Sequence, residues 1–96
     1  MTDEDQGRLV LRAQAGDARA FDELLRRHER PLFRHIFRLL GDEDRAYEVL
    51  QQTFLVLVRN IRRLRSRESF RPWAYGVATR VPPVAVATSL VARGAR

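Results

Sequence analysis

Arginine and aromatic side chains are interleaved over residues 59–75, and these residue types together suit single-stranded nucleic acid. The segment reads RNIRRLRSRESFRPWAY. Guanidinium groups can follow the phosphates of a strand, and rings can stack on unpaired bases at about 1–3 kcal/mol for each base. The alternative is that Phe70 and Trp73 are core residues on one inward helical face and that the arginines form a solvated rim. Tyr75 lies two positions off that face and is the better candidate for exposure.

The positive charge of the chain is concentrated in its C-terminal part. Residues 1–58 carry nine arginines and eleven acidic residues, whereas residues 59–96 carry nine arginines and one acidic residue, Glu68. So many cations beside one acid repel one another unless an anionic partner binds them. The distribution therefore favours a polyanion, with nucleic acid as the leading candidate, although a solvated face or an acidic protein partner would give a similar pattern.

The remaining polar residues form no pattern typical of a catalytic or metal site. His28 and His35 are seven residues apart, and the chain has no cysteine and no HExxH-type spacing. The acidic residues cluster at expected helix starts, where capping explains them, and the five glycines form no phosphate-binding loop. We therefore expect neither an enzyme nor a metal or cofactor site, and we expect both histidines to be core or surface residues.

Helical periodicity runs through most of the chain before Pro82, without the alternation typical of strands. This pattern predicts an all-α fold, a compact bundle of about four helices. The expected helices cover about residues 4–15, 18–40, 42–63 and 70–80. Pro31 predicts a kink or a break near residues 29–30 in the second of them.

Two glycine–aspartate pairs mark the predicted helix boundaries. Gly16 and Gly41 are expected to end a helix in the left-handed conformation, and Asp17 and Asp42 to cap the helix that follows. The third helix has an inward stripe of Ala46, Val49, Leu50, Thr53, Phe54, Leu57, Val58 and Ile61. Its other side carries Tyr47, Glu48, Gln51, Gln52 and Leu55.

The chain length of 96 residues leaves room for one small domain. We expect this domain to span residues 1–81 and residues 82–96 to form a flexible or weakly helical tail. The acidic start differs from a secretory signal, and the longest apolar stretch falls short of the roughly 20 residues that cross a bilayer. A cytoplasmic protein without a membrane span is expected.

Three segments make the chain resemble region 2 of RNA polymerase sigma factors of the sigma-70 superfamily, specifically the extracytoplasmic-function (ECF) group. The resemblance covers about residues 8–80, and its middle segment is the most specific. The segments are Gly16-Asp17-Ala18-Arg19-Ala20-Phe21, Gly41-Asp42 through Ala46-Tyr47-Glu48-Val49-Leu50-Gln51-Gln52-Thr53-Phe54, and Phe70-Arg71-Pro72-Trp73-Ala74-Tyr75.

The resemblance implies two binding surfaces. One would dock on the clamp helices of the beta-prime subunit of core RNA polymerase, through Tyr47, Glu48, Gln51, Gln52 and Leu55. The other would hold the unpaired minus-ten strand of promoter DNA, through Arg59, Asn60, Arg62, Arg63, Arg65, Arg67, Arg71, Tyr75 and Arg80. An anti-sigma factor is a further partner that the resemblance suggests.

The sequence departs from the family pattern at two positions and at its end. Tyr47 stands where the family usually has an acidic residue, and Arg80 follows Thr79 where an asparagine is common. The second promoter-reading domain of the family, region 4, is expected to be absent. The predicted function is a sigma factor domain in transcription initiation. The alternatives are a truncated decoy that binds polymerase or an anti-sigma partner without initiating, and an unrelated basic helical module that binds duplex DNA.

Overall fold

The structure of the protein is a computed structural model that describes residues 3–66 and 69–81. This part of the chain folds into α1 (Asp3–Gln14), α2 (Ala18–Leu40), α3 (Glu43–Asn60) and α4 (Phe70–Arg80), with a short 3-10 turn, η1 (Ile61–Arg63), after α3. The prediction of an all-α bundle of about four helices is confirmed. The tail predicted for residues 82–96 and the DNA-binding candidate Arg67 lie outside the described residues.

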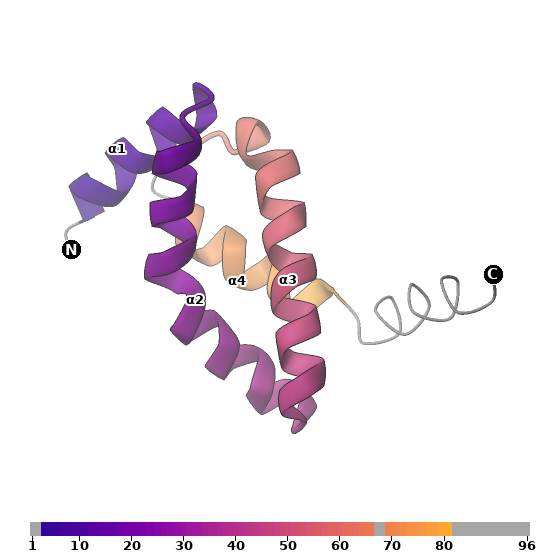
Figure 1. Ribbon diagram of the computed structural model, residues 1–96. Helices are drawn as coiled ribbons and strands as arrows, with labels where there is room; N and C mark the ends of the chain where they lie inside the picture. The colour runs from indigo at the N-terminus through magenta and orange to yellow at the C-terminus, as the bar shows by residue number, and fades with distance from the viewer. Residues whose placement is uncertain (1–2, 67–68, 82–96) are drawn as a thin grey trace.

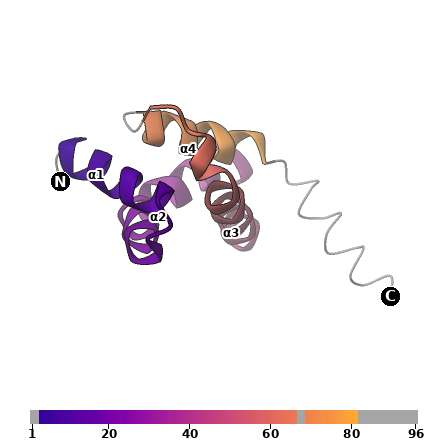
Figure 2. The same ribbon diagram turned by 90° about the horizontal axis from the view of Figure 1, so that it is seen from above.

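The helices form a small bundle in which α4 crosses a helical pair. Helices α2 and α3 run side by side in opposite directions, and α1 packs against the start of α2 (Figure 1). Seen from above, α4 lies across one side of the α2–α3 pair (Figure 2). This crossing brings the C-terminal end of α3 and the side chains of α4 to one surface.

The predicted glycine and aspartate boundaries are confirmed. Asp17 accepts hydrogen bonds from the backbone N–H groups of Arg19 and Ala20 at 3.0 and 3.2 Å, and Asp42 accepts one from Arg45 at 3.1 Å. These bonds satisfy donors that have no partner within the first helical turn. Gly16 and Gly41 have φ angles of 98° and 68°, a left-handed conformation that residues with a Cβ adopt at a cost.

Helix α2 passes through Pro31 without a break. The whole of Ala18–Leu40 is helical, and the ribbon changes direction near its middle (Figure 1). Proline removes one backbone donor and crowds the preceding turn, which favours a bend. Leu32 and Ile36, 0% and 1% exposed, anchor the second half of the helix in the core and hold it in continuous register.

The core is formed by one apolar face from each helix. Its members include Val10, Leu24, Leu32, Ile36, Val49, Leu57, Ile61, Phe70, Ala74 and Val77. Most of the stripe predicted for α3 is buried, but Val58 is 48% exposed, so its assignment to the core was wrong. Val58 follows the buried Leu57 by one position, about 100° around the helix, and lines a groove between the α1–α2 turn and the end of α3.

His28 is a core residue, which is one of the two positions, core or surface, expected for the histidines. Its side chain is 4% exposed, Nδ1 donates a hydrogen bond to the carbonyl of Leu24 at 2.8 Å, and the ring meets Phe70 edge-on at 5.2 Å. Burial lowers the pKa of His28 below its ordinary value, because the charged imidazolium loses its hydration.

The stability of the domain is therefore expected to fall as the solution becomes acidic. The unfolded chain takes up a proton on His28 below pH of about 6.5, whereas the folded chain resists this protonation, so stability decreases below that value. We expect the melting temperature to drop between pH 7.5 and 5.5, and to drop less in a His28→Leu variant. An equal drop in both proteins would show that His28 is not the group responsible.

Candidate nucleic-acid interface

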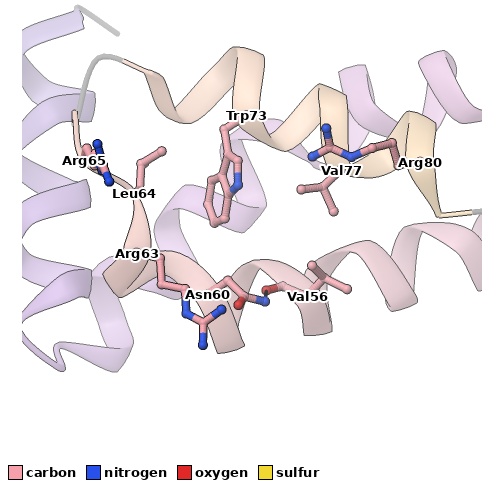
Figure 3. A pocket seen from close by; sticks show the side chains of 8 residues that line it. All are labelled: Val56, Asn60, Arg63, Leu64, Arg65, Trp73, Val77 and Arg80. Atoms are coloured by element: carbon pink, nitrogen blue, oxygen red, sulfur yellow. Dashed lines mark hydrogen bonds between the residues drawn. The ribbon is translucent and has the colours of Figure 1, made fainter.

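A groove between the end of α3 and helix α4 gathers several of the predicted DNA-binding residues. It has a volume of about 430 Å³ and is lined by Val56, Asn60, Arg63, Leu64, Arg65, Trp73, Val77 and Arg80. We call it the α3–α4 groove. Trp73 points from α4 toward α3, and the other labelled side chains surround the same space (Figure 3).

The ring of Trp73 is supported by the neighbouring ring of Phe70. It contacts Phe70 in an edge-on arrangement at 5.9 Å, and Phe70 is completely buried. Helix α4 tolerates Pro72 in its first turn, where a missing N–H has no consequence for the helix. Trp73 itself is half-buried, so part of its indole remains available in the groove. Phe70 is therefore the core residue of the pair, and Trp73 is shared between core and groove.

The groove carries three arginines that have no acidic partner in the part of the chain that the structure describes. None of the described acidic side chains forms an ion pair with Arg63, Arg65 or Arg80. Asn60 ends α3 and donates an amide hydrogen to the carbonyl of Val56 at 2.8 Å, which leaves its oxygen free to accept. The groove thus combines three cations, an amide and one aromatic face.

Two other predicted DNA-binding residues, Arg59 and Arg62, lie in a second groove. This groove, about 450 Å³, lies between the α1–α2 turn and the end of α3, and it also contains Asp17 and Asp22. Acidic side chains beside these two arginines reduce the positive potential there. The structure therefore divides the predicted set, which the sequence presented as one continuous basic segment.

Arg71 and Tyr75 lie on α4 but do not line the α3–α4 groove. The guanidinium of Arg71 is 5.8 Å from the centre of the Tyr75 ring, a cation–π distance. Tyr75 is half-buried because its ring packs against His35 of α2 at 5.2 Å. Tyr75 and Trp73 are therefore both half-buried, and Tyr75 is not the fully exposed residue that the sequence favoured. The reason is that α2 supplies a neighbour that the sequence pattern did not indicate.

His35 helps to join α2 to α4. Its Nε2 lies 2.8 Å from the Thr79 hydroxyl, which itself donates to the carbonyl of Tyr75 at 2.9 Å. Because that hydroxyl has one hydrogen, the His35 Nε2–H must be the donor in their bond. His35 is thus a structural surface residue.

The predicted polymerase-binding residues share the outward face of α3. Tyr47, Gln51 and Leu55 are exposed, and Glu48 and Gln52 are half-buried. Tyr47 packs on Phe33 of α2 at 4.5 Å, and Phe33 stacks on Phe37 at 6.1 Å. Phe33 and Phe37 were not among the predicted binding residues. The signal that could have found them is a pair of aromatic residues four apart and off the apolar stripe of α2.

No group of three or more His, Cys, Asp or Glu side chains in residues 3–66 and 69–81 is arranged to hold a metal ion. Within the same residues, no helix has both the length and the apolar character needed to cross a membrane.

The described residues form a small helical domain with a groove that carries three arginines and the ring of Trp73. Comparison with known families places it more narrowly: Sigma-70 region 2 matches residues 24–81, more than half of the chain. The chain belongs to this family of sigma factor domains. It is also 33% identical, over all 96 residues, to the RNA polymerase sigma-H factor of Pseudomonas aeruginosa (strain PAO1), and it spans 48% of that protein's length. No solved structure gives a significant match.

Proposed function

We propose that this chain is the region 2 domain of an ECF-type sigma factor, comprising residues 1–81, that acts in the cytoplasm. It binds core RNA polymerase through the outward face of α3 and holds the unpaired minus-ten strand of promoter DNA in the α3–α4 groove. The observation that carries the proposal is the combination in one groove of the Trp73 ring with three arginines that have no ion pair among the described residues.

The dimensions and chemistry of the α3–α4 groove suit a single unstacked nucleotide. A volume of about 430 Å³ lies within the range of small-ligand sites, roughly 300–1,000 Å³. A base can stack on the available part of Trp73, while Arg63, Arg65 and Arg80 neutralise the flanking phosphates. The polar atoms of Asn60 lie in the same groove and can contact the edge of the base.

The two surfaces together explain how such a domain favours an open promoter. A groove that accepts an unstacked base binds the melted duplex in preference to the paired one, and a ligand shifts an equilibrium by this difference in affinity. Docking on polymerase supplies the remaining affinity. In this proposal the domain traps melted DNA and performs no covalent chemistry.

The outward face of α3 has the character of a protein-binding surface. Tyr47 and Leu55 are 50% and 45% exposed, and they flank the two glutamines. Exposed aromatic and aliphatic side chains are enriched in protein interfaces, and the two glutamines can add hydrogen bonds to a partner. Val56 and Asn60, which line the α3–α4 groove, lie one and two helical turns beyond Gln52 toward the C-terminal end of α3, so the two surfaces are neighbours that meet at Gln52.

Replacing Gln51 and Gln52 together with alanine tests the polymerase surface. We expect the affinity for core polymerase to fall by about 5- to 30-fold, as for truncation of interface residues that contribute 1–2 kcal/mol, with the melting temperature little changed. Arg19→Ala/Arg26→Ala on α2 is the matched double control. An unchanged affinity of the glutamine variant for core polymerase would remove this surface from the proposal.

A further inference from the structure

The side chain of Gln14, the last residue of α1, binds the backbone of the turn that follows α3. Its amide Nε2 donates to the carbonyl oxygen of Ile61 at 2.9 Å and to that of Leu64 at 2.8 Å. The amide group has two hydrogens, so each carbonyl receives one. Both bonds are partly buried, which strengthens them relative to bonds in water.

Gln14 is itself fixed by the turn between α1 and α2. Arg12 forms an ion pair with Asp17 at 2.8 Å, and the backbone N–H of Asp17 donates to the carbonyl of Arg12 at 2.9 Å. Gly16 supplies the left-handed conformation that the turn requires, and Asp17 caps α2. The end of α1 is therefore a rigid support, and the Gln14 amide reaches the η1 turn from a defined position.

The two carbonyls that Gln14 contacts lie on either side of Arg63, and the second of them belongs to the peptide bond that joins Leu64 to Arg65. Arg63, Leu64 and Arg65 all line the α3–α4 groove. Three arginines within four residues, 62, 63 and 65, repel one another, and the carbonyls at the end of a helix lack partners within it. Leu64 also donates its backbone N–H to the carbonyl of Ile61 at 3.2 Å, so the Ile61 carbonyl accepts a bond from the turn as well as one from Gln14.

We propose that Gln14 is a positioning residue for strand capture: by binding the carbonyls of Ile61 and Leu64 it holds the turn so that Arg63 and Arg65 stay at the edge of the groove that Trp73 lines. This inference rests on the proposed function of the groove. Gln14 precedes the residues 24–81 that match the family and lies outside the groove it supports. It touches neither the strand nor polymerase, and it acts through the backbone of the turn.

Gln14→Met, which keeps the length of the side chain and removes the amide, tests the proposal. We expect the complex of the variant with core polymerase to bind fork-junction DNA with an unpaired minus-ten strand about 3- to 10-fold more weakly, the loss expected for one or two hydrogen bonds. The affinity for core polymerase should not change. In the free chain, the backbone amide of Leu64 should exchange its hydrogen faster than in the unsubstituted chain.

A second variant and a control on the same helix keep the result interpretable. Gln14→Asn retains the amide but is one methylene too short to keep both bonds, and it should behave as Gln14→Met does. Leu11→Ala alters an exposed residue of α1 and should change none of the three readouts. All binding is measured well below the melting temperature of each variant.

Each outcome decides the proposal. Unchanged strand affinity in both Gln14 variants would overturn it, and so would a parallel loss of polymerase and strand affinity, since that indicates a general structural role. Failure of the unsubstituted complex to bind the strand would contradict the proposed function itself. In that case the amide exchange of Leu64 would still report whether Gln14 holds the turn.

Discussion

Replacing Arg63 and Arg65 together with glutamate is expected to weaken binding of the unpaired strand by the polymerase-bound chain about 10- to 100-fold at moderate salt. Both residues line the α3–α4 groove, and neither has an acidic partner among the described residues. Loss of two phosphate contacts should also make the dependence of log affinity on log salt concentration less steep by about 1.4, because fewer counterions are released.

The matched control changes the same charge elsewhere. Arg19→Glu/Arg26→Glu alters two exposed arginines of α2 that line no described groove, with the same change in net charge. This variant should change the affinity for the unpaired strand by no more than about threefold at moderate salt, because only the screened long-range field is altered. Equal losses in the two variants would mean that overall charge, and not this groove, accounts for strand binding.

The substitution Phe70→Ala is expected to destabilise the domain by about 3–5 kcal/mol, most of the stability typical of so small a domain. Phe70 is completely buried at the start of α4 and touches both His28 and Trp73. Its removal leaves a cavity where α4 meets α2 and takes away the support of the Trp73 ring. The melting temperature should fall by roughly 15 °C or more.

Phe37→Ala makes the same chemical change at a surface position. Phe37 is 41% exposed and its ring stacks on Phe33 at the surface of α2, so the melting temperature should fall by a few degrees at most. A small effect of Phe70→Ala, comparable to that of Phe37→Ala, would contradict the packing of α4 on the core. Strand binding by Phe70→Ala at low temperature should be weaker as well, since Trp73 loses its support.

Much of the fold was predictable because its signals are local. The left-handed glycines at 16 and 41 and the caps at Asp17 and Asp42 lie within a few residues of the boundaries they set. The periodic stripe of α3 likewise predicts burial, since a helical face repeats every three or four residues. The error at Val58 arose because the pattern shows which residues are apolar but not how far a covering helix extends.

The arrangement of the candidate site was only partly predictable, since it depends on how α4 crosses α3. The basic segment shows no sign that Arg59 and Arg62 lie beside Asp17 and Asp22, away from Arg63. Two interpretations of Trp73 were possible, a core residue or a ring that stacks on a base. Its half-buried position in the groove is compatible with both. The contacts of Gln14 with Ile61 and Leu64 join positions that are 47 and 50 residues apart, and nothing in the sequence pattern indicated them.

The most direct test of the central claim is to assemble the chain with bacterial core RNA polymerase and measure binding to fork-junction DNA with an unpaired minus-ten strand. The account predicts co-purification with polymerase, capture of the unpaired strand in preference to the paired duplex, and loss of capture in Arg63→Glu/Arg65→Glu. Polymerase binding without strand capture would contradict the account and favour a decoy. Absence of polymerase binding, or tight binding to duplex DNA by the free chain, would contradict it as well.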